Sequence, residues 1–283
     1  MTQPVYIGAG LPKINTWFPS FKPNPRASLR LFCLPYSGAG ASIYNKWLPA
    51  FPTTVEVCPV QLPGREARLS ERGFTRIQPL VQELVQALLP YLDKPFAFFG
   101  HSMGALVSFE VTRYLRRYHD VIPLHLFVSG HGAPHLPDDD PPIHALPEPE
   151  FVAKLRDLNG TPDEVLQHDE LRQLLLPILR ADFAVCETYT YEPDAPLDCS
   201  ISALGGLHDT YAGRDRLAAW KQETRASFSV RMFPGNHFFI NTARQLVVQT
   251  VARELSQILR TPVTGKAHDT AVAASTAHSP TGS

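Results

Sequence analysis

The sequence predicts an α/β protein with a mostly parallel central sheet and helices on both faces, and three observations lead to that class. Short apolar runs typical of buried strands recur along the chain, among them 29–34, 55–60 and 96–99. Amphipathic helical patterns lie between such runs, as in residues 77–91. The chain has 283 residues, of which 44% are hydrophobic, so we expect one large domain with a sizeable core.

The composition argues against several classes of function. The formal net charge is −1, so there is no electrostatic case for binding nucleic acid or an anionic membrane. The first residues lack a basic segment followed by an apolar run, and no apolar stretch is long enough to span a bilayer. The cysteines lack metal-ligand spacing and indicate free thiols rather than a disulfide framework. We therefore expect a cytoplasmic protein. The four cysteines are Cys33, Cys58, Cys186 and Cys199.

Composition also divides the chain into three parts. Residues 1–28 are rich in Pro, Gly and polar residues and predict an irregular N-terminal arm, anchored by Trp17 and Phe18. Residues 29–260 carry the α/β pattern. Residues 261–283 are mostly Thr, Ala, Ser, Gly and Pro with no apolar periodicity, and predict a disordered C-terminal tail.

The first strands of the domain end in loops rich in small residues. Residues 29–34 predict a strand that runs into the loop 35–40, and a helix is expected from about Ser42. Small residues let the backbone approach a ligand and direct N–H groups at it. Residues 55–60 predict the next strand, which ends at the loop 62–66, and residues 77–91 predict the crossover helix that follows.

The central feature of the chain is the segment Gly100-His101-Ser102-Met103-Gly104. An apolar strand precedes it and a helix expected to run to about Tyr118 follows it, which is the context of a nucleophile elbow. Gly-x-Ser-x-Gly alone is short, and the alternative is a chance pattern in a turn. With both flanks present, the segment predicts that Ser102 is a nucleophile at a helix N-terminus. At the other end of this helix, Arg116 and Arg117 are expected to be solvated cations that complement the dipole.

An insertion is expected between about residues 133 and 191, where the pattern changes. It contains a Pro- and Asp-rich segment and then two helical patterns, at 150–158 and 169–189. The second pattern has a broad apolar face, which suits a lid that lines an acyl channel; ordinary packing on the sheet is the alternative. Asp182, beside Arg180, is interpreted as half of a structural ion pair.

The last elements of the domain are two strands and a terminal helix. Residues 199–204 and 228–233 predict the strands, with a short helix at 217–224 between them. Asn241 is expected to cap the final helix.

A serine nucleophile needs a base and a group that orients the base. In α/β-hydrolases the chain order is Ser, then Asp or Glu, then His. Asp209 and His237 follow strands in that order, so both are predicted at the carboxyl edge of the sheet with Ser102. Asp215 is the second choice for the acid, but it lies in or beside a helix.

Four other histidines are poorer candidates for the base. His101 belongs to the elbow and is expected to point elsewhere, while His131 and His135 precede Asp209 and break the order. His208, next to the acid, is expected to be a solvated loop residue.

The oxyanion of the tetrahedral intermediate needs two N–H donors. In hydrolases of this architecture one comes from the residue after the nucleophile and one from the loop after an early strand, which here means Met103 and Ser37. The alternative for residues 35–40 is a plain turn. The chemistry predicted from Ser102, His237 and Asp209 is acyl transfer to water, and it requires no metal and no cofactor.

Several segments together resemble the stand-alone type II thioesterases of polyketide and nonribosomal peptide biosynthesis. These segments are 31–40, 62–66, 100–104, 179–182, 187–189 and 235–239. The resemblance covers about residues 17–260 and departs from the family at Ser37, where Ala is frequent, and at Asn236, where Gly or Asp is frequent.

That resemblance implies an α/β-hydrolase fold with a flexible helical lid, the triad Ser102, Asp209 and His237, and a transient partner, an acyl or peptidyl carrier protein. It also implies hydrolysis of stalled or aberrant acyl thioesters on the carrier's phosphopantetheine arm. We expect a monomer. Two alternatives stay open: an esterase or acyltransferase acting on free small molecules, and a catalytically inactive binding module.

Overall fold

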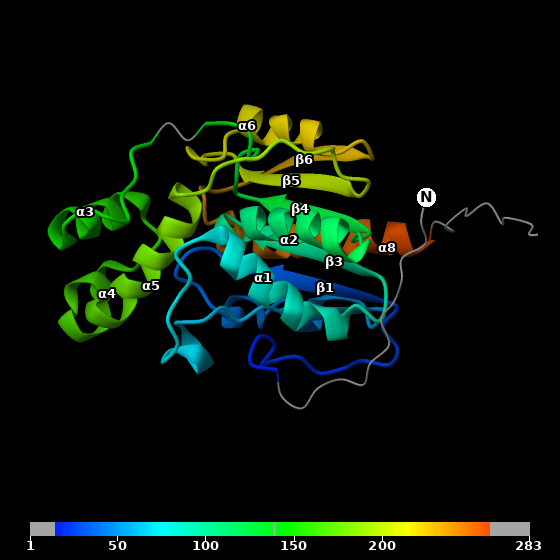
Figure 1. Ribbon diagram of the computed structural model, residues 1–283, viewed down its shortest axis with the longest axis horizontal. Coiled ribbons are helices and arrows are strands. Elements are labelled where there is room, and N and C mark those ends of the chain that lie inside the picture. The colour runs from blue at the N-terminus through cyan, green and yellow to red at the C-terminus, as the bar shows by residue number, and fades with distance from the viewer. Residues whose placement is uncertain (1–14, 138–139, 261–283) are drawn as a thin grey trace, which may run out of the picture.

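The computed structural model of the protein describes residues 15–137 and 140–260 (Figure 1). The predicted disordered tail, residues 261–283, and the first 14 residues of the predicted arm lie outside the described residues. Residues 15–28 form no helix or strand, yet Trp17 and Phe18 are buried. The Phe18 ring packs edge-on against Tyr91 at 4.9 Å, and the Arg68 guanidinium lies 4.3 Å from the Trp17 ring centre. This stretch is therefore docked through its two aromatic residues.

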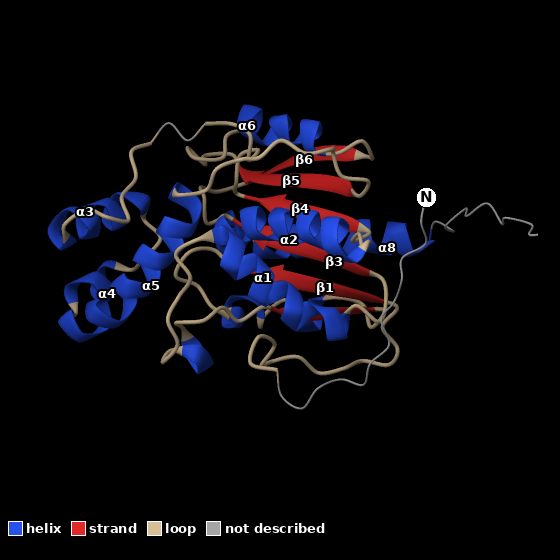
Figure 2. Ribbon diagram, in the orientation of Figure 1, coloured by secondary structure: helices blue, strands red, loops and turns tan. Residues whose placement is uncertain are grey.

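The centre of the molecule is a six-stranded parallel sheet with the strand order β2-β1-β3-β4-β5-β6 (Figure 2). Every neighbouring pair is parallel, so all six carboxyl ends lie at one edge. The structure confirms the predicted fold class and each predicted strand. The strands are β1 (Leu29–Leu34), β2 (Val55–Pro59), β3 (Phe96–His101), β4 (His125–Ser129), β5 (Ser200–Gly206) and β6 (Phe228–Phe233).

Helices cover both faces of this sheet, as Figures 1 and 2 show. On one face α1 (Ile77–Leu88) and α2 (Met103–His119) pack over a core that includes Phe98. On the other face α8 (Arg244–Arg260) packs over a second core that includes Phe99. Successive residues of a strand point to opposite faces, so an apolar run such as β3 supplies both cores at once. No helix in the described part of the chain combines the length and apolar character needed to cross a bilayer.

Three helices lie between β4 and β5 and form the insertion, beyond the carboxyl edge of the sheet (Figure 1). They are α3 (Glu148–Leu158), α4 (Asp163–Gln167) and α5 (Asp169–Glu187). The insertion has a small core of its own, separate from the two cores of the sheet. Its buried members are Phe151, Val152, Leu155, Leu166, Leu176 and Leu179.

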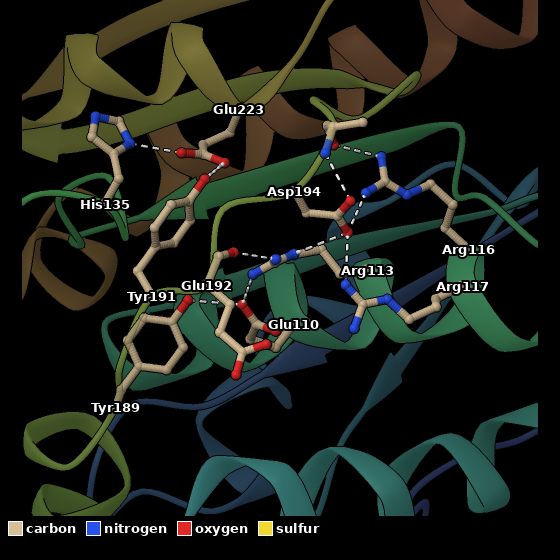
Figure 3. Close-up of polar contacts among 11 residues, drawn as sticks. Glu110, Arg113, Arg116, Arg117, His135, Tyr189, Tyr191, Glu192, Asp194 and Glu223 are labelled. Atoms are coloured by element: carbon tan, nitrogen blue, oxygen red, sulfur yellow. Dashed lines mark hydrogen bonds and ion pairs between the residues drawn. The ribbon is translucent and has the colours of Figure 1, made fainter.

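The chain returns from the insertion through an extended segment that α2 holds in place (Figure 3). Tyr189 donates to the Glu110 carboxylate at 2.8 Å, and Asp194 accepts hydrogen bonds from Arg116 at 2.8 Å and Arg117 at 3.2 Å. The prediction that these arginines are solvated holds for Arg117, which is exposed, but it omits the ion pairs that both side chains make. A carboxylate nearly eighty residues away in sequence pairs with both, which no local pattern reveals.

Two helix predictions also need correction. Asn241 does not cap the final helix; it lies inside a short helix α7 (Phe239–Thr242), which ends before α8 begins at Arg244. The Asx-type hydrogen bond before α7 comes instead from Asn236, whose Oδ1 accepts the Phe238 N–H at 3.0 Å. The helix expected from about Ser42 is only a 3₁₀ turn, Ala41–Tyr44, and a second one follows at Leu48–Ala50. Pro49 within that second turn limits helical hydrogen bonding there.

All four cysteines lie in the described part of the chain, and no disulfide joins any of them. Cys33, Cys58 and Cys199 are buried, and burial raises the thiol pKa of each, that of Cys199 to about 12. These three thiols are therefore uncharged packing groups at neutral pH.

Candidate active site

Ser102 occupies a strained turn between β3 and α2. Its backbone has φ 53° and ψ −121°, a conformation that residues other than glycine rarely adopt. A Cβ at Gly100 would collide with the Gly104 carbonyl, and a Cβ at Gly104 would collide with the end of β1. The Ser102 N–H donates to the Ser129 carbonyl of β4 at 2.7 Å, which ties the turn to the neighbouring strand. The turn thus has the strain and close packing of a nucleophile elbow.

Asp209 and His237 lie in the loops that follow β5 and β6. The two strands are neighbours, and their loops stay in register because the His208 N–H donates to the Gly235 carbonyl at 2.9 Å. His237 Nδ1 then lies 2.9 Å from Asp209 Oδ2, although the residues are 28 positions apart. A carboxylate can only accept, so Nδ1 carries the proton and Nε2 is left as a free base.

The Asp209 carboxylate is built to stay ionised. Burial opposes its ionisation, but the hydrogen bond and charge of His237 and the N–H groups of Ala212 and Tyr211 outweigh burial, so the pKa of Asp209 lies below its usual value. Tyr211 and Ala212 donate to its other oxygen at 2.9 and 3.1 Å. The carboxylate is therefore fixed in orientation and stabilises a positive charge on His237.

His101 links the elbow to His237. Its ring is fully buried, with Nε2 3.0 Å from the His237 carbonyl and Nδ1 2.9 Å from Ser129 Oγ. The carbonyl requires a proton on Nε2, so in the neutral ring Nδ1 accepts from the Ser129 hydroxyl. Burial first, and the neighbouring His237 second, hold the pKa of His101 well below its usual value.

The expectation that His101 points away from the site is therefore only half right. It has no free base nitrogen, but it holds the backbone of His237, the residue whose side chain pairs with Asp209. The sequence contains no signal for this contact except that position 101 ends a buried strand.

The predicted oxyanion donors lie in two segments that follow neighbouring strands, β3 and β1. Met103 is the first residue of α2 and Ser37 lies in the turn after β1. Within residues 15–137 and 140–260, neither backbone N–H has a hydrogen-bond acceptor. Both are therefore available to donate a hydrogen bond to a bound molecule.

The insertion touches the rim of this site at two places. Leu179 of α5 packs on Gly38, where an added Cβ would come 2.6 Å from the leucine Cδ2. The turn after α3 packs through Gly160 on the Phe238 ring, and that ring lies 5.2 Å from the His237 ring. The insertion therefore rests, through α5 and the turn after α3, directly on the loops that carry Ser37 and His237.

The remaining predicted residues lie elsewhere. His208 is exposed, as expected, and Asp215 is in the first turn of α6 (Arg214–Ala218). Asp182 is in an ion pair, but its partner is Arg65 and not Arg180, whose guanidinium donates to the His144 carbonyl at 2.7 Å. Asp182 falls on the apolar face of α5, and a charge on such a face needs a buried partner, so the sequence carried a signal that a partner exists without identifying it.

Comparison with known proteins supports the same chemistry. The family model described as "Thioesterase domain" matches residues 29–259. The chain is 45% identical over 247 residues to the gramicidin S biosynthesis protein GrsT of Aneurinibacillus migulanus, covering 87% of this chain and 96% of that protein.

Solved structures agree with the sequence match. The thioesterase RedJ from the prodiginine biosynthetic pathway of Streptomyces coelicolor superposes with a TM-score of 0.76 at 39% identity, over 84% of this chain and 92% of that one. The type II thioesterase BorB from the borrelidin biosynthetic cluster superposes with a TM-score of 0.78 at 32% identity, over 87% of this chain and 100% of that one.

Proposed function

The chain belongs to the thioesterase family, and on that premise we propose that it is a serine thioesterase that hydrolyses acyl thioesters held on phosphopantetheinyl carrier proteins. It removes stalled or aberrant acyl groups from a polyketide or nonribosomal peptide synthase. Support for the pathway comes from relatives named for gramicidin S, prodiginine and borrelidin biosynthesis. The observation that carries the proposal is the Asp209–His237 pair, at the sheet edge where the strained Ser102 turn ends β3.

The reaction proceeds in two acyl transfers. His237 Nε2 takes the Ser102 proton as Oγ attacks the thioester carbonyl, and Asp209 stabilises the imidazolium. The tetrahedral intermediate collapses, the C–S bond breaks, and the imidazolium gives its proton to the departing thiolate of the carrier arm. Water then attacks the acyl-serine with His237 again as base, and the acid leaves with Ser102 restored.

The backbone N–H groups of Ser37 and Met103 bind the oxyanion in both transfers. Their help is greatest when charge has developed on the oxygen, so they lower the barrier rather than improve substrate binding. Ser37 contributes only its N–H, so its departure from the alanine frequent in the family does not remove the donor. The carrier protein is a transient partner, and a monomeric, cytoplasmic enzyme stays a prediction.

The first test compares variants on matched substrates. Ser102→Ala and His237→Ala are expected to lower kcat for an acyl carrier protein by roughly 10⁴-fold or more, because triad members act as a unit. His208→Ala is the matched control: the residue is exposed and lies next to Asp209, and its activity should stay within about twofold of wild type. A fluorophosphonate probe should label wild-type Ser102.

Two results would overturn the proposal. Unlabelled Ser102 in wild type, with no thioester turnover, would identify a binding module. Faster hydrolysis of a free ester than of the carrier thioester with the same acyl group would favour the small-molecule esterase instead.

A further inference from the structure

The loop that carries Ser37 is held by side chains from two other segments. We call residues 35–40 the β1 loop. Asp182 of α5 accepts the Gly38 N–H through Oδ2 at 2.7 Å. Arg65 grips the same carboxylate with both terminal nitrogens, at 2.6 and 2.8 Å, and its Nη1 reaches the Ala39 carbonyl at 3.3 Å. One carboxylate from the insertion and one guanidinium from the loop after β2 therefore fix two consecutive residues of the β1 loop.

This ion pair lies inside the protein. Asp182 is 3% exposed and Arg65 is 4% exposed. Desolvating two charges costs several kcal/mol, so a buried pair of this kind is weak evidence for a gain in stability. What it does supply is geometry, because a bidentate guanidinium fixes the plane of the carboxylate and hence the direction of the oxygen that faces Gly38.

The peptide held in this way adjoins the proposed oxyanion donor. The Gly38 N–H points at Asp182, and the Ser37 N–H belongs to the preceding peptide. Gly38 has φ +80°, so this bend of the chain depends on glycine, and Leu179 of α5 packs directly against it. The same helix thus supplies both the apolar wall and the carboxylate that set the turn.

From these contacts we infer that Asp182 is a positioning residue of the reaction. Held by Arg65, its carboxylate fixes the Gly38 peptide so that the Ser37 N–H points at the reacting oxygen, and it makes the oxyanion site depend on the place of α5. The inference rests on the proposed function. Its consequence is that a shift of α5 removes a transition-state donor, so the insertion contributes to catalysis as well as covering the site.

The test needs a readout of the transition state. Asp182→Ala is expected to lower kcat by roughly 10- to 100-fold, which is no more than the fall in kcat caused by losing a whole oxyanion donor. KM should change by less than about threefold. Affinity for a trifluoromethyl ketone analogue of the acyl group, which forms a tetrahedral adduct with Ser102, should fall by the same factor. Affinity for the free acid product should not change.

A matched control is present on the same helix. The Glu187 carboxylate accepts two backbone N–H groups where Asp182 accepts one. Its donors are Ile143 and His144, at 2.9 and 3.0 Å, which belong to the insertion and not to the β1 loop. Glu187→Ala therefore removes a comparable contact, and it should leave the affinity for the tetrahedral adduct within about twofold of wild type. Asp182→Asn, which keeps an acceptor for Gly38, should recover part of the loss.

The outcomes separate the two proposals. If Asp182→Ala does not fold, Asp182→Asn and Arg65→Lys carry the same readouts, with a loss of adduct affinity of at least threefold expected. Unchanged adduct affinity in the folded variants, or an equal loss in Glu187→Ala, would overturn the positioning role while a labelled, active wild type leaves the proposed function intact. Wild type that neither reacts with fluorophosphonate nor hydrolyses thioesters would overturn both.

Discussion

At the scale of single residues, the Ser102 turn depends on glycine at position 104. The missing Cβ lets the first turn of α2 lie against the carbonyls of Leu34 and Pro35, at the start of the β1 loop. An added methyl group has backbone on its far side, which cannot move aside as the end of a flexible side chain would. Any side chain at position 104 would therefore push apart the two segments that carry the proposed oxyanion donors.

Gly104→Ala should lower the free energy of unfolding by about 1–3 kcal/mol, because it overpacks a backbone contact. Gly213→Ala is the matched control, since a Cβ at Gly213 meets nothing within 4 Å and its φ of −59° suits alanine. That control should stay within about 0.5 kcal/mol of wild type. Urea unfolding followed by circular dichroism measures both, and equal stability of the two variants would contradict the crowding argument.

The sequence offered candidate residues where position after a strand decided them. Ser102, Asp209 and His237 could be selected because each lies in the turn or loop that follows a predicted strand, and parallel strands bring such positions to one edge. It could not pair Asp182 with Arg65, which are 117 positions apart, because a pattern shows that a buried charge needs a partner but not which one. The contact of His101 with His237 was missed for the same reason.

At the scale of elements, β4, β5 and β6 are joined to α8 by a buried polar chain. His125 Nε2 lies 2.9 Å from Ser202 Oγ, and that hydroxyl donates to Glu254 at 2.6 Å, so Nε2 must carry the proton. Glu254 also accepts from Arg231 of β6 at 2.6 Å. The other ring nitrogen, Nδ1, is buried with no partner among the described residues, so a second proton on the ring has no acceptor.

Burial therefore lowers the pKa of His125 to about 4, although the nearby Glu254 carboxylate partly offsets this by raising it. The unfolded ring takes a proton below about pH 6.5, while the folded ring takes one only below about 4, so the unfolded state holds more protons between these values. The unfolding free energy must then fall as pH falls through this window, by up to about 3 kcal/mol from this residue.

His125→Gln removes the titrating group while keeping a donor for Ser202. The variant should be less stable than wild type at pH 7, because it loses the ring packed 4.3 Å from Phe127, but its stability should fall less between pH 7 and 4.5. Urea unfolding at several pH values measures the two slopes. Other buried groups, His101 included, are the same in both proteins and cancel in the comparison. Parallel slopes would show that His125 is not buried as a neutral ring.

The elements themselves were predictable to different degrees. Strands such as β1 and β3 were found because a buried parallel strand is mostly apolar, although β1 also buries Arg30. The five-residue helix α4 was missed, since it spans too few residues to show a helical period. The break between α7 and α8 was missed because Asn241 resembles a cap in sequence, while the chain leaves helical geometry only at Ala243, with φ −106° and ψ 22°.

At the scale of the whole molecule, the protein has one large sheet domain and a smaller body of three helices beside it (Figure 1). Helix α5 belongs to both. Leu176 packs in the core of the insertion, while Val185, two to three turns later, packs in the core under α1 and α2. Pro177 lies near the middle of the helix, next to Leu176, and removes one backbone hydrogen bond there. The two bodies can therefore differ in stability although a single helix joins them.

Two phenylalanines test this separation because both are fully buried but fill different cores. Phe127 lies in the core between the sheet and α8, and Phe127→Ala should lower the global free energy of unfolding by about 3–5 kcal/mol.

Phe151 lies in the core of the insertion, edge-on to Phe183 at 5.9 Å and with the Arg180 guanidinium 4.3 Å from its ring centre. Phe151→Ala loses comparable packing, but the loss falls on the insertion. The main unfolding transition should then shift by less than about 1 kcal/mol, while amide hydrogen exchange becomes faster in α3 and α4 but not in β3.

Because α5 also carries Asp182, a loosened insertion should reduce thioester hydrolysis without unfolding the sheet. Equal losses of global stability in the two variants would mean that the insertion and the sheet fold as one unit, and that α5 cannot shift independently of the site it covers.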